Sequence, residues 1–447
     1  MQMKKKIFAV YVFLLAMVVS IMPMEIKAKD SMEVQFDVYA SVYDFGARVD
    51  KIVIELPEAV KSDSVHKDTF TITSANKSNA SLEVLNGKRN ISNISVSDAK
   101  NGSKKESGKY IIIELETELH TKYAEILQWD EEHFTNVPRD VQYNVKQNKA
   151  MRNKEGNTAS YSFKQHTFIQ NEVDEFSEGT SASGLHYRDF KPKKDGKKHP
   201  LIIWLHGAGE GGKNNVTQIN GNRGAVAFIG EQAKKVFDNP YVLAPQSPDY
   251  WMPKLVLGDL TLKGTDNTAN LVSLIKDYIK ENPNVDPSRV YIGGCSMGGY
   301  QTWETLFAAP ELFAAAFPIC AAYPVPKDKL ELVKKVPIWL VHAENDDTIP
   351  VQYTRDAFAN LKEIGGNVQY TEYANVQIKG EDFASHGSWI YPLNNDPKND
   401  EGVHFFEWMA AQRKSETEKA NNYILVLIGA AVLIVTGGLW MKKHKNA

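Results

Sequence analysis

One serine of this 447-residue chain lies in the pattern Gly-x-Ser-x-Gly, at positions 294–298. An apolar run precedes it and a segment with helical character follows it. Glycines beside a serine permit a tight turn between a strand and a helix, which exposes the hydroxyl and directs the next backbone N–H toward a substrate. Ser296 is therefore a candidate nucleophile, and the N–H of Met297 is a candidate oxyanion donor. Because so short a pattern also arises by chance, the assignment depends on partners elsewhere in the chain.

Acidic and basic partners follow Ser296 in the order serine, acid, histidine. The apolar strand predicted at 337–342 leads into a loop that holds three acidic residues, Glu344, Asp346 and Asp347. Asp346 lies 50 residues after Ser296, and His386 lies 40 residues after Asp346. Each interval accommodates about one helix and one strand, as a step of an α/β sheet requires. An imidazole can take and return a proton at neutral pH, so we predict His386 as the base and Asp346 as the acid that orients it.

A glycine-rich loop precedes these residues in the chain. The apolar run 201–205 predicts a buried strand, and residues 206–212 after it read His-Gly-Ala-Gly-Glu-Gly-Gly. Such a loop presents main-chain N–H groups, and we predict that Ala208, with Gly209 as a further candidate, joins Met297 in an oxyanion hole. The alternative is a phosphate-binding loop, but the Lys-Ser or Lys-Thr of that motif does not follow.

The elements expected to position these residues fall into two groups. In the second part of the chain, helices are predicted at 266–281, 298–309, 352–363 and 401–413, and strands at 290–295, 313–320, 337–342 and 368–373. This alternation predicts a mostly parallel sheet with helices on both faces, whose exit loops share one edge. The first part instead has short alternating segments at 34–42, 49–56, 69–73, 110–115 and 141–145. They predict an antiparallel β-sandwich.

These motifs together resemble bacterial carboxylesterases related to polyhydroxybutyrate depolymerases and feruloyl esterases. The resemblance is carried by residues 204–210, 286–291, 294–298, 342–350 and 386–389, and it extends over about residues 30–413. The sequence is similar in particular to the subgroup in which an immunoglobulin-like domain precedes the hydrolase. The family implies an α/β-hydrolase fold, a doubly wound and mostly parallel sheet, and a serine esterase that acts through an acyl-enzyme. Its His-x-x-x-Asp-x-x-x-Pro spacing favours Asp346 over the two neighbouring acids.

The predicted pocket is less defined than the catalytic residues. Trp251 and Trp389 either line an acyl subsite or pack beneath the loops. Residues 321–336 are too few for a cap domain between two strands, so an accessible site is expected, unless residues 247–264 or the first domain form a lid. The sequence leaves open whether the first domain binds substrate, shields the site or mediates homo-oligomers.

No cofactor or metal is expected from the residue pattern. Cys295 and Cys320 read as small buried side chains rather than as ligands or a disulfide, and metal-binding spacings such as Cys-x-x-Cys and His-Glu-x-x-His do not occur. A net charge of −3 with a pI near 6.4 gives no reason to expect nucleic acid as a partner. The partners to expect are an ester substrate and a membrane.

The ends of the chain predict where the protein works. Three lysines and an apolar stretch favour a signal peptide over an uncleaved anchor, and 19 uncharged residues followed by lysines predict a transmembrane helix. The expected organisation is 1–28 signal peptide, 29–172 immunoglobulin-like sandwich, 173–413 hydrolase, 414–422 tether, 423–441 transmembrane helix and 442–447 cytoplasmic tail. By the positive-inside rule, the catalytic domain is expected outside the cell, anchored to the cell membrane by a single C-terminal pass.

The sequence therefore predicts an extracytoplasmic, membrane-anchored serine carboxylesterase acting on short-chain or polysaccharide-linked esters, such as acetyl or feruloyl esters. A serine peptidase of the prolyl-oligopeptidase type uses the same residue order. However, that class normally carries a long propeller, whose repeats are not visible here. A surface binding protein with a degenerate hydrolase domain is the third interpretation.

Overall fold

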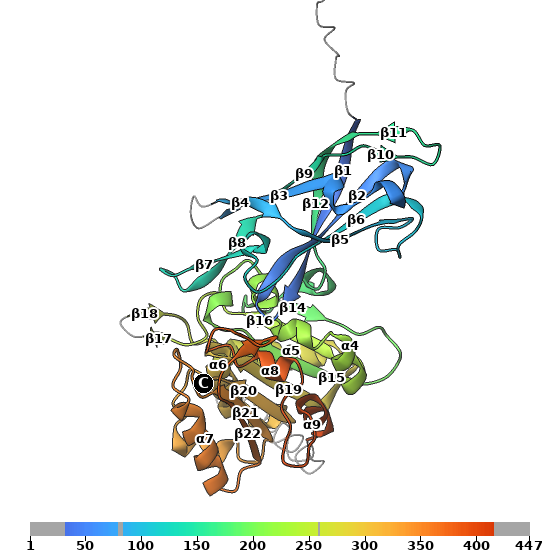
Figure 1. Cartoon of the computed structure of the whole chain (residues 1–447). Helices are drawn as coiled ribbons and strands as arrows, with labels where there is room; N and C mark the ends of the chain where they lie inside the picture. The colour runs from blue at the N-terminus through green and yellow to red at the C-terminus, as the bar shows by residue number, and fades with distance from the viewer. Residues whose placement is uncertain (1–31, 79–83, 258–259, 415–447) are drawn as a thin grey trace, which may run out of the picture.

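The computed structural model describes residues 32–78, 84–257 and 260–414. The predicted signal peptide, transmembrane helix, cytoplasmic tail and all of the tether beyond Lys414 lie outside these residues. Among the residues described, no helix has both the length and the apolar character needed to cross a membrane. A sandwich of two β-sheets is followed by an α/β domain built on a single large sheet (Figure 1). The predicted fold class is confirmed.

The sandwich consists of two five-stranded sheets. The first has the order β12-β1-β2-β6-β5, and the second the order β4-β3-β8-β7 with β9 paired to β3. Their bounds are β1 Met32–Tyr43, β2 Gly46–Lys61, β3 Phe70–Ser78, β4 Val84–Arg89, β5 Ile91–Ser97, β6 Ser107–Leu115, β7 Leu127–Asp130, β8 Thr135–Asp140, β9 Tyr143–Gln147 and β12 Tyr161–Gln170. A small hairpin, β10 Met151–Arg152 and β11 Thr158–Ala159, lies beside them. Every second residue from Phe70 to Asn76 is buried along β3, as a half-buried strand requires.

Five of these strands, β1, β2, β3, β6 and β9, coincide with the segments expected from alternation, and β4, β5, β7, β8, β10, β11 and β12 were not expected. Along β7 and β8 only Arg139 is buried, so their sequences lack a clear apolar period. β12 alternates half-buried with exposed side chains and contains several polar residues. It pairs in parallel with β1, an arrangement that depends on contacts distant in sequence rather than on a local pattern.

The hydrolase sheet has eight strands in the order β13-β14-β16-β15-β19-β20-β21-β22. Their bounds are β13 Ser177–Thr180, β14 His186–Phe190, β15 His199–Leu205, β16 Tyr241–Gln246, β19 Val285–Cys295, β20 Ala315–Ile319, β21 Ile338–Ala343 and β22 Val368–Tyr373. Neighbouring strands are parallel from β16 to β22, whereas β13 and β14 extend the sheet antiparallel. Every residue of β15 is buried because helices cover both faces of the sheet.

Helices pack on both faces of the sheet. Apolar residues of α5 Thr268–Glu281, α6 Met297–Ala308 and α7 Gln352–Glu363 share one core, and those of α3 Gly224–Ala227, α4 Glu231–Phe237 and α9 Phe405–Ala411 belong to the other. On α5 the buried residues are Leu271, Leu274, Ile275 and Tyr278, which form one stripe. The helix predicted at 401–413 begins only at Phe405, because His404 has extended backbone angles at its N-cap. The remaining short elements are α2 Thr217–Asn220, α8 Ile390–Leu393 and the hairpin of β17 Lys254–Leu257 with β18 Leu260–Lys263.

The sandwich packs over the loops that leave the hydrolase strands (Figure 1). The turn between β1 and β2 carries Asp44, whose Oδ1 accepts hydrogen bonds from Arg223 at 3.2 Å and from the Asn394 amide at 3.0 Å. Elsewhere in this interface, the hydroxyl of Tyr250 donates to the carbonyl of His133 at 2.6 Å. The expected accessible site is therefore bordered by the first domain, which is one of the alternatives that the sequence left open.

The approach of α6 to β15 yields a first prediction. A Cβ placed on Gly298 lies 2.0 Å from the carbonyl oxygen of Leu205, so Gly298→Ala forces the backbone of a central strand to move. We expect a loss of about 1–3 kcal/mol in unfolding free energy, measured by denaturant titration of the full chain. Gly230→Ala is the matched control, because the nearest atom to its added Cβ is 3.3 Å away and the change should cost only about 0.5–1 kcal/mol, the loss from Ala at the N-cap of α4. Equal losses in the two variants contradict this packing argument.

Candidate active site

Ser296 occupies a strained turn between β19 and α6. Its φ of 55° lies in the region that residues with a side chain rarely adopt. The turn is held from three directions: the Ser296 N–H donates to Ile319 at 2.9 Å, and its carbonyl accepts the N–H groups of Tyr300 and Ala322 at 3.0 Å each. These bonds fix the half-buried serine at the rim of a pocket.

The glycines of the motif are explained by close backbone contacts. A Cβ on Gly294 would lie 2.4 Å from the carbonyl oxygen of Leu205, the same atom that excludes a side chain at Gly298. The exit of β15 and the start of α6 therefore lie nearly in backbone contact. This contact brings the loop after Leu205 beside Ser296.

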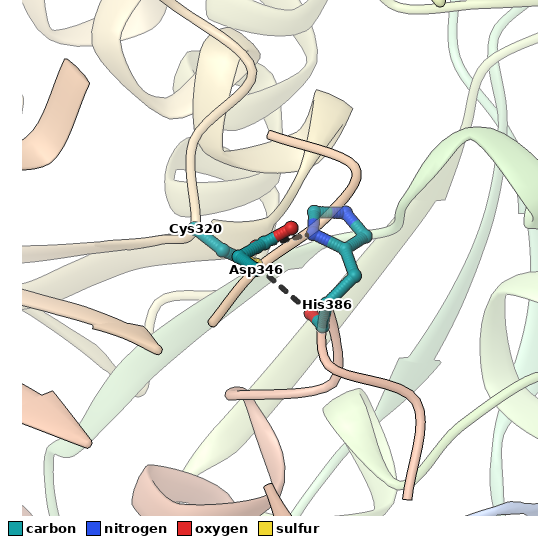
Figure 2. A group of neighbouring side chains, drawn as sticks. All are labelled: Cys320, Asp346 and His386. Carbon is teal, nitrogen blue, oxygen red and sulfur yellow. Dashed lines mark hydrogen bonds and ion pairs between the residues drawn. The ribbon is translucent and has the colours of Figure 1, made fainter. Parts of the chain in front are cut away.

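Asp346 and His386 are hydrogen-bonded, as predicted. His386 Nδ1 donates to Asp346 Oδ2 at 2.7 Å, and the two side chains face each other in Figure 2. The Asp346 side chain is fully buried, and its Oδ1 accepts the N–H groups of Thr348 and Ile349 at 2.9 Å each. Burial alone raises the pKa of Asp346, but hydrogen bonds from His342 and His386 outweigh it and hold the pKa well below its ordinary value. The carboxylate is thus charged and can keep the imidazole in one orientation.

A second histidine, His342 at the end of β21, also supports Asp346. Its Nε2 lies 3.0 Å from Asp346 Oδ2 and 3.2 Å from the carbonyl of Ile349, so this nitrogen carries the proton. Its Nδ1 is 2.7 Å from the hydroxyl of Thr354 on α7. Sequence reasoning used His342 only as the first residue of the His-x-x-x-Asp-x-x-x-Pro spacing and did not predict its hydrogen bond to Asp346.

The two neighbouring acids point elsewhere. Glu344 is exposed and pairs with Arg355 at 3.4 Å, and the exposed Asp347 accepts a hydrogen bond from Thr348. Of the three acidic residues in the loop, Asp346 is the one whose carboxylate bonds to His386.

The second ring nitrogen of His386 faces the site. Nε2 is buried and has no hydrogen-bond partner among the described residues, and no hydrogen bond joins it to Ser296 in that part of the chain. Both residues line one pocket of about 320 Å³. The structure therefore brings serine and histidine to one cavity without a direct bond between them, which is common when no substrate is bound.

The loop after β15 is fixed by His206. Its Nε2 accepts the N–H of Ser247 at 3.0 Å, so Nδ1 carries the proton and donates to the Gly207 carbonyl at 2.6 Å. Burial lowers the pKa of His206 to about 4, so the ring is neutral and serves as a brace. The loop continues into a short turn of 3-10 helix at Ala208–Glu210.

The three predicted oxyanion donors begin helical turns. Met297 is the first residue of α6, and Ala208 and Gly209 are the first two of the 3-10 turn. The first N–H groups of a helix have no carbonyl partner within it, so they are available to an anion. A Cβ on Gly209 would lie 2.9 Å from the amide of Asn136 and 3.0 Å from the ring of Trp129, both from the sandwich.

The sandwich supplies one wall of the pocket. Phe45 comes from the β1–β2 turn, and Trp129, Phe134 and Asn136 come from the β7–β8 hairpin. Trp129 and Phe134 contact each other edge to face at 4.7 Å between ring centres. Sequence reasoning missed these residues, because no local pattern connects the hairpin to the motifs of the hydrolase.

The two tryptophans proposed for the pocket differ in position. Trp389 lines the pocket and meets the His386 ring edge to face, with centres 5.6 Å apart. Trp251 is completely buried and lies against His206, with ring centres 5.1 Å apart, and its backbone N–H donates to the sulfur of Met297. Trp251 thus packs against His206 and Met297, beneath the predicted oxyanion donors and outside the residues that line the cavity.

Glu210 is an unexpected acid in this pocket. It is 8% exposed, and its Oε1 accepts a hydrogen bond from Asn136 of the sandwich at 3.3 Å. Burial raises the pKa of Glu210 to about 7, although the N–H of Gly207 and the Asn136 amide partly offset this. A carboxyl group between the glycine-rich loop at 206–212 and the first domain therefore changes charge near neutral pH.

The described residues that come nearest to a metal site are part of the same cluster. Cys320, Asp346 and His386 each offer one ligand atom within 4.8 Å of the others (Figure 2). Burial raises the pKa of the Cys320 thiol, which keeps its proton and donates weakly to the His386 carbonyl at 3.6 Å. Metal ions bind the thiolate rather than the thiol, so these residues fit an acid–base pair better than a metal site. Both Cys320 and Cys295 are free.

Comparison with known proteins agrees with this geometry. Residues 36–160 match the family described as esterase Ig-like N-terminal domain, and residues 192–382 match the phospholipase/carboxylesterase family. The crystal structure of a thermostable esterase superposes with a TM-score of 0.73 at 31% identity, covering 85% of this chain and 99% of that chain.

Two curated proteins match smaller parts of this chain. A bifunctional acetylxylan esterase/xylanase from Neocallimastix patriciarum is 32% identical over 102 residues, which are 23% of this chain and 15% of that enzyme. Acyl-protein thioesterase 1 from Emericella nidulans is 23% identical over 230 residues, which are 44% of this chain and 94% of the thioesterase.

The fold and these matches define a carboxylic ester hydrolase of the α/β-hydrolase class. More narrowly, the chain belongs to the carboxylesterases in which an immunoglobulin-like domain precedes the hydrolase. The predicted family and enzyme class are confirmed.

The loop acids provide a test of the histidine's partner. We expect Asp346→Asn to lower kcat by about a thousandfold to ten-thousandfold, because the amide no longer holds His386 in the required tautomer. Asp347→Asn and Glu344→Gln remove a carboxylate from the same loop without touching His386, and should leave kcat within about twofold. Steady-state hydrolysis of p-nitrophenyl acetate measures all three. A comparable loss in either neighbour would reassign the acid.

Glu210 should make folding stability fall as pH rises. Its carboxyl ionises at about 4.5 in a solvated chain but at about 7 in the fold, so the unfolded state loses its proton first. Each unit of difference is worth about 1.4 kcal/mol, so stability declines by a few kcal/mol between these pH values and is flat above them. Glu210→Gln removes this decline.

The measurement is the thermal midpoint of wild type and variant between pH 4.5 and 8. The difference, variant minus wild type, should increase with pH up to about 7 and then stay constant. The exposed Glu401→Gln serves as the control and should show no such trend. A pH-independent difference for Glu210→Gln is the result that would refute the assignment.

Proposed function

We propose that this protein is a membrane-anchored serine carboxylesterase in which Ser296 is the nucleophile, His386 the general base and Asp346 its orienting acid. The observation that carries the proposal is the buried Asp346–His386 bond, which leaves His386 Nε2 unpartnered among the described residues, in the pocket that the strained Ser296 also lines. No other acid of the loop reaches that histidine.

The first half-reaction forms an acyl-enzyme. Ser296 Oγ attacks the ester carbonyl carbon while its proton passes to His386 Nε2, and Asp346 stabilises the imidazolium that results. The carbonyl oxygen becomes an oxyanion, which accepts hydrogen bonds from the N–H of Met297 and of Ala208, with Gly209 adjacent. His386 then returns the proton to the alcohol oxygen as the carbon–oxygen bond breaks.

The second half-reaction reverses these roles with water. His386 Nε2 removes a proton from a water molecule, whose oxygen attacks the acyl carbon, and the same donors bind the new oxyanion. The proton passes to Ser296 Oγ as the acid leaves. The chemistry requires no cofactor, in keeping with the absence of metal-binding spacings from the sequence.

The pocket supports acyl groups of modest size. It measures about 320 Å³, at the lower end of the range of about 300–1,000 Å³ for small-ligand sites. Aromatic rings line it, including Trp389 from the hydrolase and Trp129 from the sandwich. Such a site suits acetyl and other short acyl chains or a flat feruloyl group. The acetylxylan esterase similarity supports a polysaccharide-linked ester.

The cellular location rests on the two ends of the chain. A basic and apolar start favours export, and the apolar stretch 423–441 followed by lysines favours a C-terminal anchor with the catalytic domain outside the cell. Protease treatment of intact cells tests this orientation: the folded domains should be accessible from outside while a tag after residue 447 is protected.

The catalytic proposal is tested by ester and amide substrates in parallel. Wild type should hydrolyse p-nitrophenyl acetate through octanoate with a preference for the shorter chains, whereas a prolyl-peptide amide should be cleaved slowly or not at all. Ser296→Ala should reduce ester turnover by at least about a thousandfold, since the nucleophile is lost. Undiminished turnover in that variant would refute the triad, and preferential amide cleavage would favour the peptidase interpretation.

A further inference from the structure

A second pocket adjoins the catalytic one. It measures about 350 Å³ and shares Asp44 and Phe45 with the first as a common wall. We propose that this second pocket binds the alcohol half of the substrate ester and that it accepts a sugar ring. The inference rests on the esterase function proposed above, and it concerns the substrate class of that site.

Both domains contribute to the second pocket. The sandwich supplies the β1–β2 turn and the loop at 117–119, and the hydrolase supplies the hairpin of β23 Gln377–Ile378 with β24 Glu381–Asp382 and the segment 390–396. His120, next to the sandwich loop, lies 3.6 Å from Glu381 on the hairpin. The pocket therefore exists only where the two domains meet.

The shared wall is held firmly in place. Asp44 at the tip of the turn accepts hydrogen bonds from Arg223 and Asn394 of the hydrolase. Arg223 also donates to the Asn394 side-chain oxygen at 2.6 Å, which closes a triangle of polar contacts. Since the turn is fixed by charge-assisted bonds, the two pockets keep a constant relation, as binding of two halves of one substrate requires.

Aromatic rings in this pocket are fixed as well. The ring of Tyr391 stacks on Tyr373, with centres 3.8 Å apart and planes 14° apart. The Tyr391 hydroxyl donates to the Asn375 carbonyl at 2.9 Å and accepts the Gln377 N–H at 3.0 Å, so the tyrosine joins the hairpin to α8. Rings whose hydroxyls are already bonded present an apolar surface to the C–H face of a ligand.

The polar lining distinguishes the second pocket from the first. The sandwich contributes Thr117 and the carboxylate of Glu118 to this lining. The hydrolase contributes Gln377 and the carboxylate of Asp396. Asp396 Oδ2 accepts the Tyr373 hydroxyl at 2.6 Å, and its second oxygen provides a further acceptor. Carboxylates form short, strong hydrogen bonds with hydroxyl groups, so this lining suits a polyhydroxylated group.

The two linings match the two halves of an ester. An acyl group in the aromatic first pocket presents its carbonyl at Ser296, and the alcohol oxygen then points away from the acyl chain. The neighbouring pocket across the Asp44–Phe45 wall is where the remainder of the alcohol fits. A hydroxyl-rich alcohol can donate hydrogen bonds to the exposed carboxylates there, whereas an alkyl alcohol has no hydroxyl group to offer them.

The test compares two esters with the same acyl group. Acetylated xylo-oligosaccharides and ethyl acetate differ only in the alcohol, and kcat/KM is measured for both with the full chain. The variants are Glu118→Gln, Asp396→Asn and the double substitution, one carboxylate from each domain. We expect the double variant to lower kcat/KM for the sugar acetate by about tenfold or more, because charge-assisted bonds are lost, and to leave ethyl acetate within about twofold.

Glu401→Gln and Asp400→Asn are matched controls on exposed residues outside both pockets, and each variant's thermal midpoint verifies folding. Wild type that cleaves neither ester would overturn the esterase proposal itself. Wild type that cleaves ethyl acetate but shows no preference for the sugar acetate, or variants that lower both substrates equally, would overturn the sugar subsite alone. Preserved sugar-acetate activity in the folded double variant would do the same.

Discussion

The buried charge of Asp346 is the constraint on which the site depends. A carboxylate taken out of water is costly unless nearly every lone pair is bonded, and here four donors surround it: two histidine N–H groups and two backbone N–H groups. They come from the end of β21, from its exit loop and from the loop that carries His386. The end of β21 and its exit loop are thereby tied to a loop that lies 40 residues further along the chain. The hydrogen bonds that stabilise the charge also orient His386.

The same logic applies on the other side of Ser296. The loop after β15 is held on one side by the neutral His206, which bonds to Gly207 and Ser247. On its other side the sandwich packs so closely that a side chain at Gly209 would collide with Asn136 and Trp129. The first domain is therefore part of the pocket's construction rather than an appended module. Glu210 is buried by this contact, which explains why a carboxyl group near the predicted oxyanion donors has a pKa of about 7.

Sequence reasoning located what is encoded locally. The Gly-x-Ser-x-Gly motif and the acidic loop each follow a strongly apolar strand, and His386 comes after the alternating strand β22. Parallel strands bring their exit loops to one edge. The fold class followed from the same alternation. The spacing of His342 from Asp346 helped to select the acid, but the hydrogen bond between the two side chains depends on tertiary geometry and was not predicted. Trp251 and Trp389 were indistinguishable, since both lie on loops and only packing decides which one is covered.

What the sequence did not reveal lies across the domain boundary. Along β7 and β8 only Arg139 is buried, and neither strand has a recognisable motif, yet their hairpin lines the catalytic pocket with Trp129 and Phe134. The role of the turn around Asp44 could not be predicted either, because its partners Arg223 and Asn394 lie more than 170 residues away in sequence. A pocket assembled by two domains places selectivity in their interface. Substitutions there can change which alcohol is accepted without touching Ser296, Asp346 or His386, and a family that keeps its hydrolase motifs can vary its substrates through the sandwich.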